Sequence, residues 1–402
     1  MNDALSPSSQ SVSLPAAATA GDVLTVHLTA QAGAFLRALP LVHALPRTDG
    51  PPRADGGPDG RGPGGPADRV GELLRAVRRV GGALHTFAAV VQPGWAQELR
   101  DELRWLLGTL SREPSCDRRL ARLLGSLDSL TGTAAPDRLP PQRGAEPPGA
   151  DRSGGTGILA GHAGAAKARA LLERQLTAAR SRVHSENLQQ LRSARLHALA
   201  DRMTLMSGEV PLAAPAAGPA AEVLLPQAAA ALRALERAAR ALPLASAGTA
   251  YNGDALHRLG GEGPSEGRGP GAAAGDPGAA VGGPGAAGAP AADDAPWLRV
   301  RILAKRARYA LEVCEPLLDG QAAGTAARLG ALGRVLDRHQ EAADAAATAA
   351  AVACTPRITP ATAYVLGVVH ADQRLEVEAA RYAFGRQWPE VADRARHGWA
   401  VR

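Results

Sequence analysis

The sequence is poor in lysine and in aromatic residues. Among 45 Lys and Arg residues only Lys167 and Lys305 are lysines, so arginine carries almost all of the positive charge. The chain has 5 Trp, 4 Tyr and 3 Phe, and it lacks long runs of β-branched residues. This composition argues against an all-β sandwich or barrel. Leu and Ala, which favour helices, must fill the core.

Cysteine and long apolar segments are also scarce. The 3 cysteines, Cys116, Cys314 and Cys354, lack CxxC spacing and cannot build a disulfide framework, which indicates a reducing compartment. We expect Cys314 and Cys354 to lie in the core. Residues 1–19 do not have the pattern of a secretion signal, and no uncharged apolar run approaches the ~20 residues of a membrane span. We therefore expect a cytoplasmic protein that does not bind membranes.

Three segments are rich in Gly, Pro and small or charged residues and have little to bury: 47–67, 131–157 and 260–296. Such compositions do not offset the entropy lost on ordering, so we predict that these segments are disordered linkers, like the N-terminal residues 1–21. The rest of the 402-residue chain is long enough for two helical halves, at 22–205 and 220–402.

Between the linkers, apolar residues recur at spacings of three and four, which predicts helices and no strands. Pro114 is expected to end one helix, and Pro389 to separate the last long helix from a short one. The predicted fold class is all-α. The predicted helices cover 23–45, 69–91, 95–110, 117–130, 165–203, 220–242, 297–317, 325–353, 361–384 and a short segment after Pro389.

The chain contains a weak internal repeat. A shift of 227 residues places 69–87 on 296–314, where Arg78 meets Lys305 and Arg79 meets Arg306. In both copies a break and a Leu-rich helix follow. The repeat predicts two related helical bundles in one chain.

The second copy, WLRVRILAKRARYALEVC, has a basic face. On a helix, Arg301, Lys305 and Arg308 fall within roughly 60° of one another, and the apolar residues gather on another face. Glu312 is placed to contact Arg308 at i,i+4. The helix offers no acid to Arg301 or Lys305. A solvated surface with one salt bridge is the alternative interpretation.

Two other predicted helices are basic. The first copy of the repeat carries Arg75, Arg78 and Arg79. The 165–203 helix has eight cations, among them Arg182 and Arg195, against three acids. If these helices converge, their cations repel one another unless an anion lies between them. Guanidinium groups donate paired hydrogen bonds to phosphate oxygens, so phosphate chains suit such a surface.

The stretch LRVRILAKRARYALE resembles the second signature helix of the CHAD domain family, which is named for conserved histidines in an α-helical domain. The stretches 69–87, 181–199 and 329–342 are similar to other helices of the family, and the resemblance extends from about residue 20 to the C-terminus. The positions of the two signature histidines hold Gly71 and Leu298. The residues that match the family pattern are Arg301, Lys305, Arg306, Arg308 and Tyr309.

The resemblance implies two pseudo-symmetric four-helix bundles with a basic cavity between them that binds inorganic polyphosphate without catalysis. The expected partner is inorganic polyphosphate, either free or in granules. The expected location is therefore the cytoplasm, where the protein could associate with polyphosphate granules. The candidate polyphosphate-binding residues are Arg75, Arg78, Arg79, Arg182, Arg195, Arg301, Lys305, Arg306 and Arg308.

Two other functions stay open. The missing signature histidines favour a helical scaffold or protein-interaction domain that no longer binds polyphosphate. A nucleic-acid binder is disfavoured by the shortage of aromatic side chains for base stacking. We expect no catalytic residues, cofactor or metal. His339 and Glu341, at i,i+2, lie on different faces of a helix, and no second histidine follows His339 at i,i+4, so we expect no metal site with Asp344 and expect His339 on an exposed face.

Overall fold

The computed structural model describes residues 18–43, 66–133, 157–244, 293–318 and 320–397. In these ranges the regular structure is helical apart from two isolated β-bridges, which confirms the all-α fold class. The disorder predicted for the linkers and the N-terminus falls mostly outside the described residues. At the edges of those segments the prediction is wrong, because helices begin at Ala20, Pro66 and Ala295.

The helices follow the same order in both halves of the chain. In the first half α1 packs on α2, α2 on α3, and α4 on α5; in the second, α7 packs on α9, α9 on α10, and α10 on α11. Two pairs of consecutive helices, α3 with α4 and α5 with α6, thus take the places of α10 and α11. The bounds are α1 Ala20–His43, α2 Pro66–Thr86, α3 Pro93–Leu110, α4 Arg112–Thr131, α5 Ala165–Leu191, α6 Ala194–Gly208, α7 Ala220–Arg240, α9 Ala295–Cys314, α10 Gln321–Ala353 and α11 Pro360–His397.

Three predicted helix boundaries are wrong. The predicted 165–203 helix is two helices, because Ser193 caps α6 by accepting a hydrogen bond from the Leu196 N–H at 3.3 Å. Pro114 does not end a helix but lies in the first turn of α4, where its missing N–H removes no intrahelical bond. The helix α11 runs through Pro389 because the neighbouring Trp388 and Val391 are buried in the core, and this packing outweighs the cost of proline in a helix.

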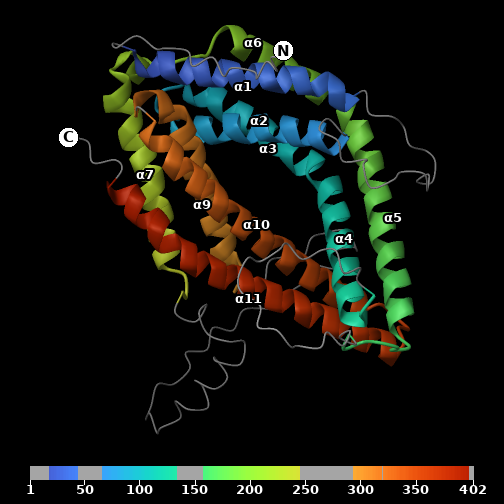
Figure 1. Ribbon diagram of the computed structural model, residues 1–402. Helices are drawn as coiled ribbons and strands as arrows, with labels where there is room; N and C mark the ends of the chain where they lie inside the picture. Colours follow the sequence, from blue (N-terminus) through green and yellow to red (C-terminus); the bar gives the residue numbers. More distant parts are fainter. Residues whose placement is uncertain (1–17, 44–65, 134–156, 245–292, 319, 398–402) are drawn as a thin grey trace, which may run out of the picture.

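Among the described residues the apolar core consists of three clusters, two of which cross between the halves. One joins α1, α2, α3 and α6 with the start of α7 and the end of α9. The second joins α7, α9, α10 and the C-terminal part of α11, and the third joins α4 and α5 with α10 and α11. Figure 1 shows the resulting arrangement, in which α1, α4, α5, α11 and α7 surround α2 and α9. Because the first and third clusters draw on both halves, the division between 205 and 220 stays a prediction.

The helices α2 and α9 cross at Gly82 and Tyr309. A Cβ atom on Gly82 would lie 2.8 Å from Cδ2 of Tyr309, so the approach of the two helices requires glycine. Residues 82 and 309 are also counterparts under the 227-residue shift. A contact between two counterparts lies on the pseudo-twofold axis that relates the halves. The crossing therefore lies on this axis, and the basic residues of α2 and α9 lie on either side of it.

The helices in the described ranges all fall short of the length and apolar character that a bilayer-spanning helix requires.

Candidate anion-binding site

Two cations of the basic face of α9 share one carboxylate. Asp337 of α10 accepts from Arg301 Nε at 2.6 Å and from Lys305 Nζ at 2.7 Å, both through Oδ1. The three side chains are about one third exposed, at 29%, 29% and 36%. The expectation that Arg301 and Lys305 lack an acid holds for α9 alone and is wrong for the folded protein, because the acid comes from the neighbouring helix.

The two cations change the pKa of Asp337 and of each other. Burial alone would raise the pKa of the Asp337 carboxyl, but Arg301 and Lys305 more than offset this and lower it below its usual value. Burial, together with the charge of Arg301, lowers the pKa of Lys305, although Asp337 opposes the effect. Asp337 is therefore ionised at neutral pH.

Arg78 of α2 brings a third cation to this cluster. It is half-buried, and in the part of the chain that the structure describes its side chain makes neither an ion pair nor a hydrogen bond. Burial lowers its pKa, while Tyr309 and Asp337 attract its charge and Arg301 repels it. Asp337 thus attracts three cations, of which Arg301 and Lys305 contact it and Arg78 does not. We call these three cations with Asp337 the axis cluster, because Arg78 and Lys305 are counterparts under the pseudo-twofold.

A second carboxylate neutralises the neighbouring cations. Glu312 of α9 accepts from Arg308 Nε at 2.9 Å, which confirms the predicted i,i+4 contact. Its other oxygen accepts from Arg79 Nε of α2 at 2.7 Å. The guanidinium of Arg308 lies against Gly330 of α10, where a Cβ would come within 3.3 Å of Nη1. We call Arg79, Arg308 and Glu312 the paired flank.

The remaining basic residue of the family pattern, Arg306, lies on a different side of α9. Burial lowers its pKa, and so do Arg100 and Arg104 of α3. Within the described ranges Arg306 makes no ion pair. Arg104 is neutralised by Asp101 of its own helix, with Nη1 2.5 Å from Oδ1. The structure thus adds Arg100 and Arg104, which the sequence analysis did not single out.

The remaining candidate residues lie elsewhere. Arg75 is exposed on α2, 3.8 Å from Glu72. Arg182 is exposed on α5 and has no ion pair among the residues that are described. Arg195 of α6 donates from Nε to Glu102 of α3 at 2.7 Å, and its guanidinium lies 4.3 Å from the ring centre of Trp105. Their positions do not associate them with the axis cluster.

Two further expectations are corrected. Cys314 is buried, and desolvation raises the pKa of its thiol to about 12, whereas Cys354 is exposed and not in the core. His339 is not on an exposed face but is 2% exposed, stacked on Trp297 at 5.3 Å, and accepts a hydrogen bond from Arg381 Nε at 3.3 Å. In the described ranges no group of three or more His, Cys, Asp or Glu side chains is placed to bind a metal.

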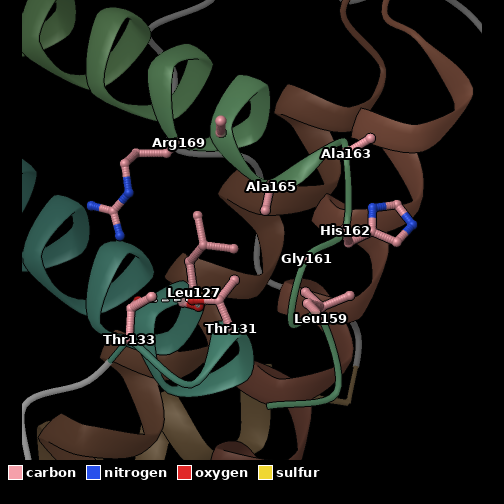
Figure 2. Close-up of a pocket in the computed structure, with 10 residues that line it drawn as sticks. Leu127, Thr131, Thr133, Leu159, Gly161, His162, Ala163, Ala165 and Arg169 are labelled. Atoms are coloured by element: carbon pink, nitrogen blue, oxygen red, sulfur yellow. Dashed lines mark hydrogen bonds between the residues drawn. The ribbon is translucent and has the colours of Figure 1, made fainter. Parts of the chain in front are cut away.

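A pocket of about 400 Å³ lies away from these cations, where α4 ends and α5 begins (Figure 2). Apolar and small residues form much of its wall, together with Thr131, Thr133 and His162. Its one arginine, Arg169, is neutralised by Asp128. The pocket therefore offers little free charge to an anion.

Comparisons with known proteins agree with the fold. The family model of the CHAD domain matches residues 63–350, so the chain belongs to the CHAD domain family. It is similar to the structure of PptA from Streptomyces chartreusis, with 37% sequence identity, coverage of 92% of this chain and 100% of that chain, and a TM-score of 0.64.

A more distant structure shows the shared fold alone. The CHAD domain from the plant Ricinus communis is 18% identical, covers 93% of this chain and 95% of its own, and has a TM-score of 0.50. No curated protein matches the sequence.

Proposed function

We propose that the protein binds inorganic polyphosphate, or a similar polyanion, without catalysis, on the basic surface around the α2–α9 crossing. The observation that carries this proposal is Arg78. A half-buried cation without a hydrogen-bonding or ionic partner is costly, and an anion would supply the missing contact. The two other cations of the axis cluster already share Asp337, so the cluster has a surplus of positive charge.

The ligand class follows from the kind of cation. Arginine keeps its charge at neutral pH and donates to two oxygens at once, which suits a chain of phosphates. Membership of the CHAD domain family supports polyphosphate as the chain in question. A binding role without catalysis is supported by Asp337, because its lowered pKa makes it a weak base.

A scaffold without a ligand is the second candidate. The observation that favours it is the number of internal ion pairs: Asp337 contacts two of the site cations, and Glu312 contacts two others. If the surplus charge is too small to attract a polyanion, the crossing would serve only to join the two halves.

The test is a titration of labelled long-chain polyphosphate at several salt concentrations. We expect wild type to bind, with an affinity that falls steeply as salt rises. Arg78→Gln should weaken binding about tenfold, because it removes a hydrogen bond to a charged group. The control is Arg240→Gln on α7, which removes one positive charge from an exposed pair with Glu236.

The outcomes separate the candidates. Equal affinities of Arg78→Gln and Arg240→Gln would refute the role of Arg78. No binding by wild type even at low salt would refute the function and leave the scaffold. Tighter binding of single-stranded DNA than of polyphosphate would favour nucleic acid instead.

A further inference from the structure

The pseudo-twofold predicts that each contact at the α2–α9 crossing has a counterpart. Under the 227-residue shift, Arg79 corresponds to Arg306 and His85 corresponds to Glu312. The ion pair between Arg79 and Glu312, at 2.7 Å, therefore predicts that Arg306 and His85 are neighbours on the other side of the axis. A carboxylate on one side of the axis is replaced by an imidazole on the other.

The electrostatic environment of His85 agrees with this correspondence. The pKa of His85 is lowered by burial first and then by Arg306 of α9 and by Arg100 and Arg104 of α3. These charged groups belong to two of the helices that pack against α2, and the side chain of His85 is exposed at the end of α2. On the paired flank the same position holds Glu312, which attracts its two arginines. The positive charge on the His85 side of the axis is thus not neutralised, whereas on the other side Glu312 neutralises its arginines.

The helix α3 increases this difference in charge between the two sides of the axis. The counterparts of Arg100 and Arg104 on α10 are Ala327 and Ala331, so the added cations have no equivalent in the second half. Arg100 hydrogen-bonds to Gln97, a neutral side chain, and its buried Nε has no hydrogen-bond partner among the described residues. Asp101, on the exposed side of α3, bonds to Arg104.

We propose that His85, Arg100, Arg104 and Arg306 form the principal phosphate subsite of this protein, open to an anion because His85 stands where the other half of the molecule has Glu312. This inference rests on the proposed function and specifies where the phosphate chain is held. Phosphate oxygens accept from Arg100 and Arg306, which have no carboxylate partner in the described chain, while Arg104, bound to Asp101, borders the subsite. His85 takes up a proton when the chain binds, because the anion offsets the positive charges that keep the imidazole neutral.

The decisive experiment exchanges the two counterparts. His85→Glu places a carboxylate beside Arg306, as Glu312 lies beside Arg79, and should weaken polyphosphate binding about tenfold or more. Arg306→Gln should weaken it to a similar extent. Glu312→Gln removes the carboxylate of the paired flank and should strengthen binding. Arg240→Gln is the control for a lost charge at a distance from the site.

The failure of this inference can be distinguished from failure of the proposed function. If Arg78→Gln weakens binding while His85→Glu and Arg306→Gln equal wild type, the chain is held at the axis cluster and the subsite is wrong. If wild type does not bind polyphosphate at all, both proposals fall.

A second measurement does not depend on the folding of the glutamate variant. Between pH 8 and pH 6 the affinity of wild type should rise more than that of His85→Gln, because only wild type takes up the extra proton. Titration of the phosphate chain itself and of the other histidines is common to both proteins and cancels in the comparison. Parallel pH profiles would overturn the role of His85.

Discussion

Two contact regions of the molecule use arginine in opposite ways. Where α4 meets α10 and α11, Arg119 lies 3.8 Å from Asp344 and Arg122 lies 3.1 Å from Glu376. At the α2–α9 crossing, Arg78 and Arg306 have no such partner in the described chain. The difference shows that in an arginine-rich protein the number of arginines says little about binding. The informative quantity is the number of cations that folding leaves without a carboxylate.

Buried apolar residues explain why the α2–α9 crossing is stable despite its unpaired positive charges. Around it the core is apolar and tightly packed, with Ala83, Leu84 and Ala310 fully buried beside the cations. The apolar contacts stabilise the crossing, so the helices are held together despite the repulsion between their basic side chains.

The largest expected effect is a loss of stability in acid. It arises from the buried His339 and not from the exposed cations. Burial, followed by the charge of Arg381, lowers the pKa of His339 to about 4, whereas an unfolded histidine titrates near 6.5. Between these values the unfolded chain binds more protons than the folded one. The free energy of unfolding is therefore greatest above pH 6.5 and falls as the pH drops towards 4, by about 3 kcal/mol at most for this one group.

Urea denaturation at pH 7, 6, 5 and 4.5 measures this loss. His27 of α1 adds to it, because burial lowers its pKa to about 4 as well. In His339→Gln the dependence should be weaker by the contribution of one histidine. An unchanged pH dependence in that variant would show that His339 does not titrate in this window.

The next effect tests whether the crossing requires close approach. Gly82→Val should destabilise the protein by about 2 kcal/mol, because the new side chain meets Tyr309 where even a Cβ would come within 2.8 Å. It should also weaken polyphosphate binding by moving α2 away from α9. Gly81→Val is the matched control, since a Cβ at that position meets no atom within 4 Å. Equal melting temperatures of the two variants would contradict this account.

Much of the fold was predictable from local sequence, because helical periodicity is a local signal. The exceptions follow from tertiary contacts. Trp388 and Val391 hold α11 together across Pro389, a packing effect that no window of sequence reveals. Ser193 was a local signal for the break between α5 and α6, since serine is a preferred N-cap residue.

The candidate site was predictable in its cations but not in its acids. The spacing of Arg301, Lys305 and Arg308 identified the basic face, and the 227-residue repeat aligned Arg78 with Lys305. Asp337 lies 32 residues beyond Lys305 on another helix, so its contact with both cations depends on how α10 packs on α9. The same repeat held the signal that distinguishes the two flanks, because it aligns His85 with Glu312.

The smallest expected effect compares the α2–α9 crossing directly with the contact between α4 and α11. Asp337→Asn removes the carboxylate that Arg301 and Lys305 share, so both cations become available and polyphosphate should bind about tenfold more tightly, a change of about 1.4 kcal/mol. Glu376→Gln removes a similar charge from the α4–α11 contact, where the pair with Arg122 is partly exposed. It should leave the affinity within about twofold and cost less than about 1 kcal/mol of stability. If both variants strengthened binding equally, the ligand would respond to net charge alone, and the distinction between paired and unpaired arginines would have no bearing on where it binds.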